Sequence, residues 1–528
     1  MTRKHISDGL APLAGRLGLA SLFGDIHNHC DLSYGHGRFT EALARAALQL
    51  DFVSVTGHAH WPDMPVDDPS VAHIVDFHVK GFARLRDAWP GHFETLAAAQ
   101  AEGFTVFPGY EIHSCEHGDY TVVYRDLDAA PLHLGNSPTE LKAALDRHMP
   151  GRAFAFPHHI GYRQGARGIN WATFDSALSP FVEMNSMHGC AETSESPRSY
   201  LHSMGPVDGH STMDWGLAQG HVFGIVGNTD HHSAFPGSYG HGRMAVLAAT
   251  NDRAAIWQGM TARHTNALTG PNIHLLTAVG ENIQGSVITP FDSATLDIEA
   301  VAGGTIDCID VIRNNRLFHR ISPALTPSPI GAPDETILFL ELGWGARGSL
   351  HRWEGRIAVE RGEVLAVEPR FRGAEVVSPL EGRDDEHLRP ELSLAEGQVR
   401  FAVTAEANPN NSTTATQGVA LRLRLDVAAV IRTVLCGWQI DIPAARLREG
   451  AFSGNLGPID SPAFRFHPLP AAADWQWQGR VALGPVADGE TLYVRLRQAD
   501  GQMAWASPLF CQNRARRALG GNPDRHGL

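Results

Sequence analysis

The chain has 528 residues, and its formal net charge is −14 at pH 7. Because this length exceeds one ordinary hydrophobic core, we expect two or three domains. The acidic balance argues against a nucleic-acid backbone or an anionic membrane surface as the main partner, since both require clustered Lys and Arg.

The six cysteines are far apart in sequence and form no Cys-x-x-Cys pair. This usage predicts reduced thiols and indicates neither a zinc ribbon nor a disulfide scaffold. We find no apolar run of bilayer-spanning length and no signal-peptide pattern at the N-terminus. We therefore expect a cytoplasmic protein.

From about Gly24 to Gly270, short β-type runs alternate with helix-like stretches. The helix-like patterns include 40–48 and 138–145, for which Thr40 and Pro138 are the predicted starts. This alternation is typical of a βα barrel or of an open doubly wound sheet. The runs that we predict to be buried parallel strands are 51–56, 104–107, 153–156, 181–184 and 222–226.

Histidines and carboxylates follow nearly every one of these strands directly. They would therefore converge at the carboxyl ends of many strands, which is the active-site rim of a barrel. An open sheet would concentrate its chemistry at one switch point, and no Gly-rich phosphate fingerprint follows the first strand. The clusters favour the barrel, and they occupy residues 25–29, 56–60, 108–111, 117–119, 157–159, 182–185 and 228–232.

The pattern changes after about residue 271. Apolar and polar residues now alternate, and Gly, Pro and Asn turns separate the runs, which predicts half-buried antiparallel strands. We expect a β-sandwich-like region over residues 276–528, either as one unit or as two small β domains. The alternating runs are 295–301, 356–360, 399–403, 419–425 and 491–497.

Metal binding is the chemistry that the first half predicts. Most of the 29 histidines lie before residue 242. Neutral imidazole and carboxylate form the ligand set for zinc, iron or manganese. In His27-Asn28-His29, both rings point to the same side of a strand, because side-chain direction repeats every two residues. Two rings on one face can share one ion.

The ordered set of motifs resembles the PHP (polymerase and histidinol phosphatase) superfamily. It consists of a first His-x-His, a second-strand Thr-x-His, a Pro-Gly-x-Glu, two later histidine sites and a closing Asp-x-His, and it covers roughly residues 24–245. The resemblance implies an α/β fold, a distorted (β/α)7 TIM-like barrel holding up to three ions, which we place in residues 1–275. The chain is most similar to a branch that appends β-rich domains to the barrel.

The resemblance also implies a ligand set and marks two departures. Glu111 matches the glutamate that bridges two ions. Gly35 stands where the family supplies an Asp or His, so His36 is the nearest candidate. Gly57 stands where an aspartate is common, which leaves the orientation of His58 to some other group. The implied metal ligands are His27, His29, His36, His58, Glu111, His117, His159, Asp230 and His232, with His158 as the alternative to His159.

Other titratable residues beside these motifs are predicted to support the site without binding metal. Glu183 is expected to contact a ligand. The remaining histidines are expected either to contact ligands or to face the substrate, and they are His60, His113, His188, His231 and His241.

Two or three divalent transition-metal ions (Zn, Mn or Fe) would lower the pKa of a shared water and clamp the oxygens of an in-line displacement. We therefore expect a metal-bridging hydroxide that attacks a small anionic substrate, a phosphate ester. Arg243 is the predicted phosphate-binding cation, and Arg163 and Arg167 are further candidates. We predict His241 or His188 as the proton donor to the leaving group.

Two alternatives remain at this point. A bridging hydroxide also attacks a carbonyl, so the substrate could be a carboxylic ester, a lactone or an amide. A non-catalytic glycan- or partner-binding protein is the alternative of another class, in which the metal only stabilises the fold. The full ligand complement argues against the second alternative, because a decayed site would be expected to lose some of it.

Overall fold

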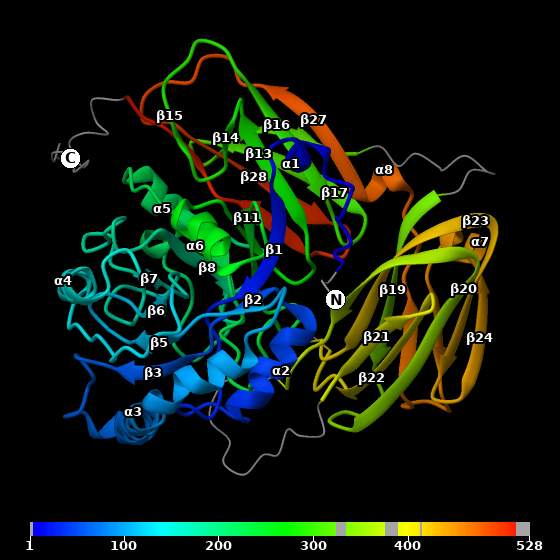
Figure 1. Ribbon diagram of the computed structural model, residues 1–528, viewed down its shortest axis with the longest axis horizontal. Coiled ribbons are helices and arrows are strands. Elements are labelled where there is room, and N and C mark those ends of the chain that lie inside the picture. Colours follow the sequence, from blue (N-terminus) through cyan, green and yellow to red (C-terminus); the bar gives the residue numbers. More distant parts are fainter. Residues whose placement is uncertain (1–3, 324–333, 375–388, 412–413, 514–528) are drawn as a thin grey trace.

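The computed structural model describes residues 4–323, 334–374, 389–411 and 414–513 and shows a mixed α/β molecule with several sheets (Figure 1). None of the helices in these ranges is long and apolar enough to cross a membrane. The helices are α1 (Pro12–Arg16), α2 (Phe39–Gln49), α3 (Ala72–Ala99), α4 (Pro138–His148), α5 (Met213–Ala218), α6 (Arg253–Thr261), α7 (Ala444–Glu449) and α8 (Ala472–Trp475).

The largest sheet joins both halves of the chain. Strands β1 (Ala20–Asp25), β2 (Phe52–Val53) and β4 (Thr105–Val106) pair in parallel, and β11 (Arg243–Ala248) pairs antiparallel to β1. Next along the sheet, β12 (Thr265–Leu268) pairs with both β11 and a strand from the C-terminal part. The other members are β15 (Val287–Ile288), β17 (Ile306–Arg313), β18 (Arg316–Ile321), β28 (Thr491–Gln498), β29 (Met503–Ala506) and β30 (Leu509–Cys511).

Two smaller sheets complete the first half. One contains β3 (Thr56–His60), β5 (Gly109–Ile112), β6 (Tyr120–Tyr124) and β7 (Ala153–Pro157). The other contains β8 (Phe181–Ser186), β9 (Gly189–Cys190) and β10 (Gly224–Gly227).

The predicted closed barrel is not found among the described residues. The strands fall into separate sheets, and no ladder joins β7 to β8. The interruption begins at β6, which the sequence did not predict. The short connection from β5 to β6 contains no helix, so the two strands pair antiparallel, and β7 then pairs antiparallel to β6. In the first half, parallel pairing returns between β8 and β10.

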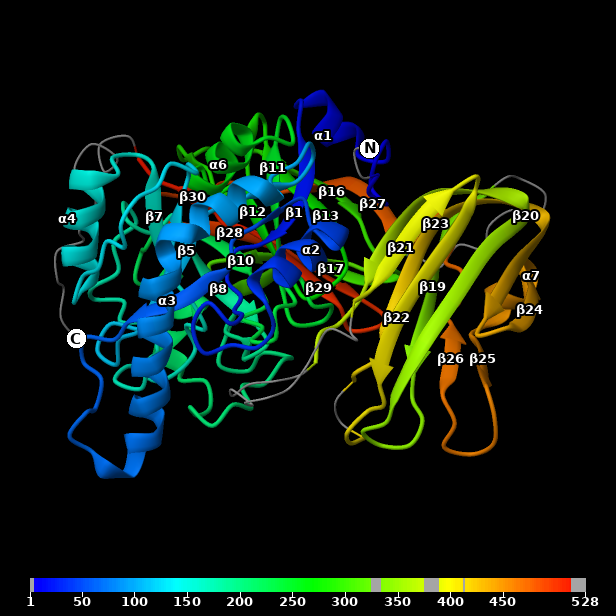
Figure 2. The same cartoon turned by 60° about the horizontal axis from the view of Figure 1, so that its bottom comes forward.

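The second half is β-rich, as the alternating pattern predicted (Figure 2). One four-stranded sheet contains β13 (His274–Val279), β14 (Asn282–Ile283), β16 (Thr295–Val301) and β27 (Gln476–Ala482). An eight-stranded antiparallel sheet lies between β18 and β27 in sequence. It contains β19 (Asp334–Gly343), β20 (Leu350–Arg370), β21 (Glu391–Ala395), β22 (Gln398–Glu406), β23 (Gln417–Leu435), β24 (Trp438–Pro443), β25 (Phe452–Asn455) and β26 (Ala463–Phe466).

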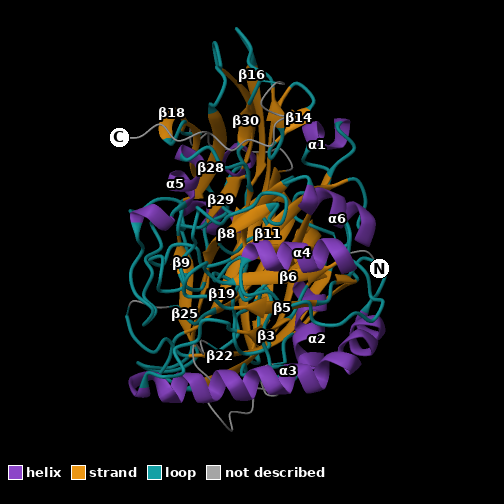
Figure 3. Cartoon of the chain, turned by 90° about the vertical axis from the view of Figure 1, so that its left-hand side faces the viewer, coloured by secondary structure: helices purple, strands orange, loops and turns teal. Residues whose placement is uncertain are grey.

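Local sequence explains where several helices begin. The Ser137 hydroxyl accepts a hydrogen bond from the Glu140 amide at 3.2 Å, and Pro138 occupies the first position of α4. A hydroxyl cap followed by proline is a strong helix start, as predicted here. The long helix α3 runs along one side of the molecule (Figure 3). It passes so close to the loop after β1 that a Cβ on Gly81 would lie 2.7 Å from Tyr34 Cδ1.

Candidate metal centre

The first and last motifs of the first half meet through their backbones. The His29 amide donates to the His231 carbonyl at 2.8 Å, and the Asp230 amide donates to the His27 carbonyl at 2.8 Å. The loop after β1 and the loop after β10 are therefore fixed against each other. Strands β3 and β5 pair in parallel and place His58 beside Glu111. All of these side chains are buried.

Four ligating atoms form one compact group. The distance between His27 Nε2 and His29 Nε2 is 3.3 Å, and Glu111 Oε2 lies 3.2 Å from the first and 3.3 Å from the second. Asp230 Oδ1 lies 3.4 Å from His27 Nε2 and 3.0 Å from His29 Nε2. Zinc–nitrogen bonds of about 2.0–2.1 Å at tetrahedral angles put ligand atoms about 3.3–3.4 Å apart. These distances are those expected between neighbouring ligands of a tetrahedral metal site, and His27, His29 and Glu111 form one group that can hold an ion.

Glu111 connects this group to others. Its Oε2 atom lies 3.6 Å from His58 Nε2, while its Oε1 atom lies 3.1 Å from His158 Nε2 and 3.5 Å from His113 Nε2. The two oxygens thus face different imidazoles, which is the arrangement of a carboxylate that bridges two cations. The resemblance assigned this bridging role to Glu111.

Further groups of ligand type surround Glu111 and Asp230. Asp119 Oδ2 lies 3.1 Å from His113 Nδ1 and 3.3 Å from His159 Nε2. Asp230 Oδ2 lies 2.8 Å from His188 Nε2, so both oxygens of Asp230 are engaged. The buried groups of three that can hold an ion are His29–His58–His232, His27–His29–Glu111, His58–Glu111–His113, Asp119–His158–His159 and His159–His188–Asp230.

The electrostatics of the centre favour cations. Burial alone would raise the pKa of Glu111 and Asp230, but the neighbouring histidines outweigh burial and hold both pKa values well below the usual range. Burial, with His29 nearby, holds the pKa of His58 well below its usual value. Ionised carboxylates beside a neutral imidazole form a ready ligand set.

Two orphaned ring atoms point to the same conclusion. His113 Nε2 and His159 Nδ1 are buried and have no hydrogen-bond partner among the described residues. A buried polar atom without a partner is costly unless a ligand satisfies it. His113 Nε2 faces Glu111, where a cation between them would satisfy both. The residues present therefore fit divalent ions.

Backbone conformation adds a further mark of a functional site. His159, Arg167 and Asp230 have φ values of 31°, 71° and 52°, in the left-handed region that side chains rarely adopt. Such strain concentrates where the surrounding structure holds a residue for function.

The structure brings together most of the predicted ligands. His27, His29, His58, Glu111, His159, Asp230 and His232 all belong to the groups described above, and His158 belongs to them as well. The choice between His158 and His159 is therefore not needed, because the two rings face different carboxylates.

His36 and His117 belong to none of these groups within the described residues. The His36 amide donates to the His232 carbonyl at 2.7 Å, so this residue contributes to the loop by its backbone. The half-buried His117 ring lies 3.3 Å from the Thr173 hydroxyl. Neither contact supports the predicted ligand role.

Arg243 does not have the contacts of the predicted phosphate-binding cation. Its guanidinium is fully buried at the start of β11 and donates to the Gly237 carbonyl, to Asn272 Oδ1 and to Gln49 Oε1. These bonds connect three segments of the fold, and the prediction for Arg243 is corrected to a structural role.

The guanidinium at the centre is that of Arg167. Its Nη2 atom donates to Asp119 Oδ2 and also contacts His113 Nδ1, and it lies 4.0 Å from Glu111 Oε1. Trp61 packs under the guanidinium, with 5.1 Å between Arg167 Cζ and the ring centroid. The Arg167 side chain is 16% exposed, so it covers the buried carboxylates from the solvent side.

The predicted proton donors have other surroundings. His188 lies between Asp230 and the Tyr162 hydroxyl, which is 2.5 Å from His188 Nδ1, so both ring nitrogens are engaged and the residue belongs with the ligands. The buried His241 ring stacks on His231, with 5.2 Å between centroids. Neither ring has contacts that favour proton transfer to a leaving group.

Two ligand-type residues were missed in the sequence. His113 was expected to lie beside the ligands, and Asp119 was not assigned a role. The signal for His113 was its spacing, because it follows Glu111 by two residues and shares its face of the strand. Asp119 was overlooked because His117, in the same His-Gly-Asp triplet, was assigned as the ligand.

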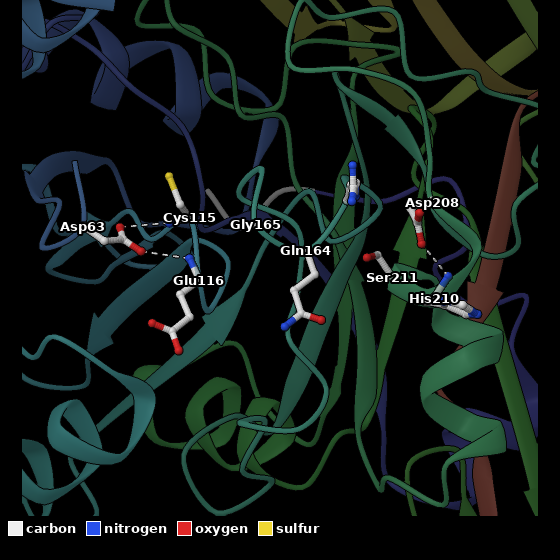
Figure 4. Close-up of a pocket in the computed structure, with 9 residues that line it drawn as sticks. Asp63, Cys115, Glu116, Gln164, Gly165, Asp208, His210 and Ser211 are labelled. Atoms are coloured by element: carbon white, nitrogen blue, oxygen red, sulfur yellow. Dashed lines mark hydrogen bonds between the residues drawn. The ribbon is translucent and has the colours of Figure 1, made fainter. Parts of the chain in front are cut away.

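An open cleft of about 550 Å³ lies beside the loop that carries Arg167 (Figure 4). The backbone ties this loop to the segment after His113, since the Gly165 amide donates to the Cys115 carbonyl at 3.0 Å. The cleft is polar and carries both signs of charge. Its lining includes Asp63, Glu116, Arg163, Gln164, Asp208 and His210.

Neither a protein-family profile nor a curated protein sequence matches this chain. Over 84% of its length, the chain is similar to 99% of a solved two-domain protein from Bacteroides vulgatus containing a predicted PHP-like metal-dependent phosphoesterase, with 12% identity and a TM-score of 0.34. Over 46% of its length it is similar to 90% of PsfC from Pseudomonas syringae, with 18% identity and a TM-score of 0.30. At these values neither structure carries an argument about the fold or the substrate of this chain.

Proposed function

We propose that this protein is a metal-dependent phosphoesterase that acts on small phosphate esters. The observation that carries the proposal is the packing of buried imidazoles around both oxygens of Glu111, beside the guanidinium of Arg167. Imidazoles and carboxylates at these spacings fit two or three divalent ions, and guanidinium is a preferred partner of phosphate.

The candidate ligands form separate metal positions, and neighbouring positions share a carboxylate. One ion would be held by His27, His29, Glu111 and Asp230. A second would be held by His58, Glu111 and His113, and the group of Asp119, His158 and His159 offers a third place. When bound, the ions would activate a water molecule and withdraw charge from the phosphoryl oxygens.

Arg167 is the residue that we assign to the phosphoryl group. Its guanidinium lies against Asp119 and near Glu111, the carboxylates of the metal centre, and its side chain is partly exposed toward solvent. Bound cations would neutralise these carboxylates and leave the guanidinium donors for an anion. Such a donor matters most where negative charge develops on the phosphoryl oxygens.

The cleft beside Arg167 is the proposed place of the leaving group. Its lining is polar and contains Arg163 and His210 as well as three carboxylates, so neither an apolar nor a strongly charged group is favoured. A small hydrophilic alcohol fits this chemistry. The substrate as a whole would be anionic only through its phosphate.

The reaction is tested with metal-loaded protein and three substrate classes: phosphomonoesters, phosphodiesters and carboxylic esters. Hydrolysis of a phosphate ester that stops on chelation and returns with zinc, manganese or iron is the expected result. Hydrolysis of carboxylic esters alone would favour the carbonyl alternative. No hydrolysis of any class by fully loaded protein would contradict the proposed activity.

The role of Arg167 is tested by Arg167→Ala with Arg86→Ala as a matched control, because Arg86 is an exposed arginine of α3. Loss of one charge-assisted donor in the transition state should lower kcat/KM for phosphate esters on the order of 10²-fold. Arg167→Lys should recover part of that loss. Equal activity of Arg167→Ala and the control would remove Arg167 from the reaction.

A further inference from the structure

The imidazoles of the centre differ in what holds their second ring nitrogen. His27 Nδ1 donates to Glu183 Oε2 at 2.8 Å, and His29 Nδ1 donates to the Thr56 carbonyl at 2.6 Å. His58 Nδ1 instead lies 2.8 Å from the hydroxyl of Ser33. Thus a carboxylate and a carbonyl hold His27 and His29, the imidazoles of the first metal position, whereas a neutral hydroxyl holds His58.

This difference matters because the outer partner sets both the tautomer and the basicity of a ligating imidazole. A carboxylate or carbonyl can only accept, so it forces the proton onto Nδ1 and leaves the Nε2 lone pair free for metal. A carboxylate also makes the ring a stronger donor to the ion. A hydroxyl can donate or accept, so it fixes no tautomer and adds no charge.

The local packing explains why an acid does not hold His58. Gly57 precedes it on β3, and a Cβ at Gly57 would lie 2.7 Å from Leu85 Cδ1 of α3. An aspartate at this position would require the Leu85 side chain to move. Ser33, which is fully buried in the loop after β1, approaches His58 from another side and supplies the hydroxyl.

Tyr34 holds the other side of the same ring without adding charge. Its ring stacks on His58, with 3.8 Å between centroids and an interplanar angle of 17°. His58 is therefore well positioned and weakly polarised. His113, the other imidazole of the second position, is held through Nδ1 by Asp119 at 3.1 Å. The difference between the positions therefore lies at His58 and in the carboxylate ligands, which are Glu111 and Asp230 at the first position and Glu111 alone at the second.

We propose that the centre holds one resident ion at His27, His29, Glu111 and Asp230 and one exchangeable ion at His58, Glu111 and His113, and that Ser33 keeps the second ion exchangeable. The inference rests on the metal centre of the proposed function but not on its substrate. The protein would then keep one ion through purification and take up the other only when free divalent metal is abundant. Activity would follow the supply of free metal.

The test is a titration of metal-free protein with Co²⁺, read by its absorption spectrum, with metal content measured in parallel after dialysis. Two binding steps of different affinity are expected in the wild type. Ser33→Ala should weaken the second step by about 10–100-fold and leave the first unchanged. Ser33→Thr keeps the hydroxyl and should restore the second step.

Two further variants separate the positions and control for packing. Glu183→Gln removes the charge behind His27 and should weaken the first step. Ser179→Ala deletes a buried hydroxyl that has no partner among the described residues and should change neither step. A single step in the wild type, or equal weakening of both steps by Ser33→Ala, would overturn the inference.

These measurements use no substrate. Two-step binding with the predicted variant effects, in a protein that hydrolyses no phosphate ester, would refute the proposed activity and leave this inference standing. Phosphoesterase activity with equal ion affinities would support the proposed activity and overturn this inference.

Discussion

The Nε2 atoms of His27 and His29 face each other across 3.3 Å in the protein interior, and both lie within 3.4 Å of Asp230 Oδ1. Both rings donate through Nδ1, His27 to Glu183 and His29 to the Thr56 carbonyl, so two Nε2 lone pairs face each other and the carboxylate. A cation bound between them and the carboxylate would accept both lone pairs.

The loaded protein is expected to contain two or three equivalents of transition metal, because the ligand groups exceed the capacity of one ion. Chelation should lower the unfolding temperature, since an ion that binds only the folded state stabilises it. His29→Ala should reduce metal content, whereas His117→Ala, outside the groups, should not. Elemental analysis and thermal unfolding provide the measurements. Less than one equivalent after reconstitution would contradict the assignment.

Arg243→Ala should destabilise the fold by about 2–5 kcal/mol, because it deletes donors to Gly237, Asn272 and Gln49 in a fully buried site. Denaturant unfolding measures this loss. At a temperature where the variant is folded, its KM for a phosphate ester should match that of the wild type. A raised KM with unchanged stability would indicate that Arg243 contacts the substrate.

His92 should make stability fall as the solution becomes acidic. Its ring lies between Phe39 and Trp89, at 4.8 Å from each centroid, and neither ring nitrogen has a partner among the described residues. Burial lowers the pKa of His92 from 6.5 to about 3. The unfolded chain therefore binds the proton first, and the stabilising contribution of neutral His92 is lost as pH falls from 6.5 toward 3, by up to about 1.4 kcal/mol per pH unit.

His92→Phe should remove this part of the pH dependence and raise stability at pH 5 relative to the wild type. The control is His73→Phe, which changes an exposed histidine of the same helix. Denaturant unfolding at pH 5 and pH 8 supplies the comparison. An unchanged difference between the two pH values in His92→Phe would show that the ring does not titrate as described.

Glu192→Ala should destabilise the protein by about 3–5 kcal/mol, since it leaves buried donors of two C-terminal strands without their acceptor. Glu192 Oε1 accepts from the Tyr493 hydroxyl at 2.8 Å and from Arg495 Nη1 at 2.9 Å, while Oε2 accepts from Trp505 Nε1 at 2.8 Å. The exposed Glu195 provides the control, and Glu195→Ala should unfold like the wild type. Similar unfolding of both variants would be contrary to expectation.

Short-range pattern accounts for part of the arrangement of the candidate site. His27 and His29 share a face because of the strand period, and parallel pairing of β3 with β5 brings His58 to Glu111. The antiparallel strand β6 was missed, although its run of Tyr, Thr and Val residues is typical of a strand. The distorted TIM-like barrel implied by the resemblance is not confirmed, because β6 pairs antiparallel to both β5 and β7.

Arg243 shows why proximity in sequence is a poor guide to side-chain direction. It lies a short distance after Asp230, but it begins β11 and points into the fold toward Gln49 and Asn272. Arg167 also lies a short distance after a motif, the one that ends at His159, and it has a φ of 71°. Its guanidinium is the one that reaches the centre. Such a contact depends on tertiary structure and has no local signal.

The hydroxyl of Ser507 anchors a strand of the candidate metal centre from the C-terminal part of the structure. Its hydroxyl accepts from the Ile225 amide at 2.9 Å and bonds the Thr265 hydroxyl at 2.8 Å, so the strand that leads to Asp230 is anchored by a residue near the far end of the chain. During synthesis the early ligands emerge from the ribosome long before this anchor. A chain that ends before Ser507 lacks this anchor of β10.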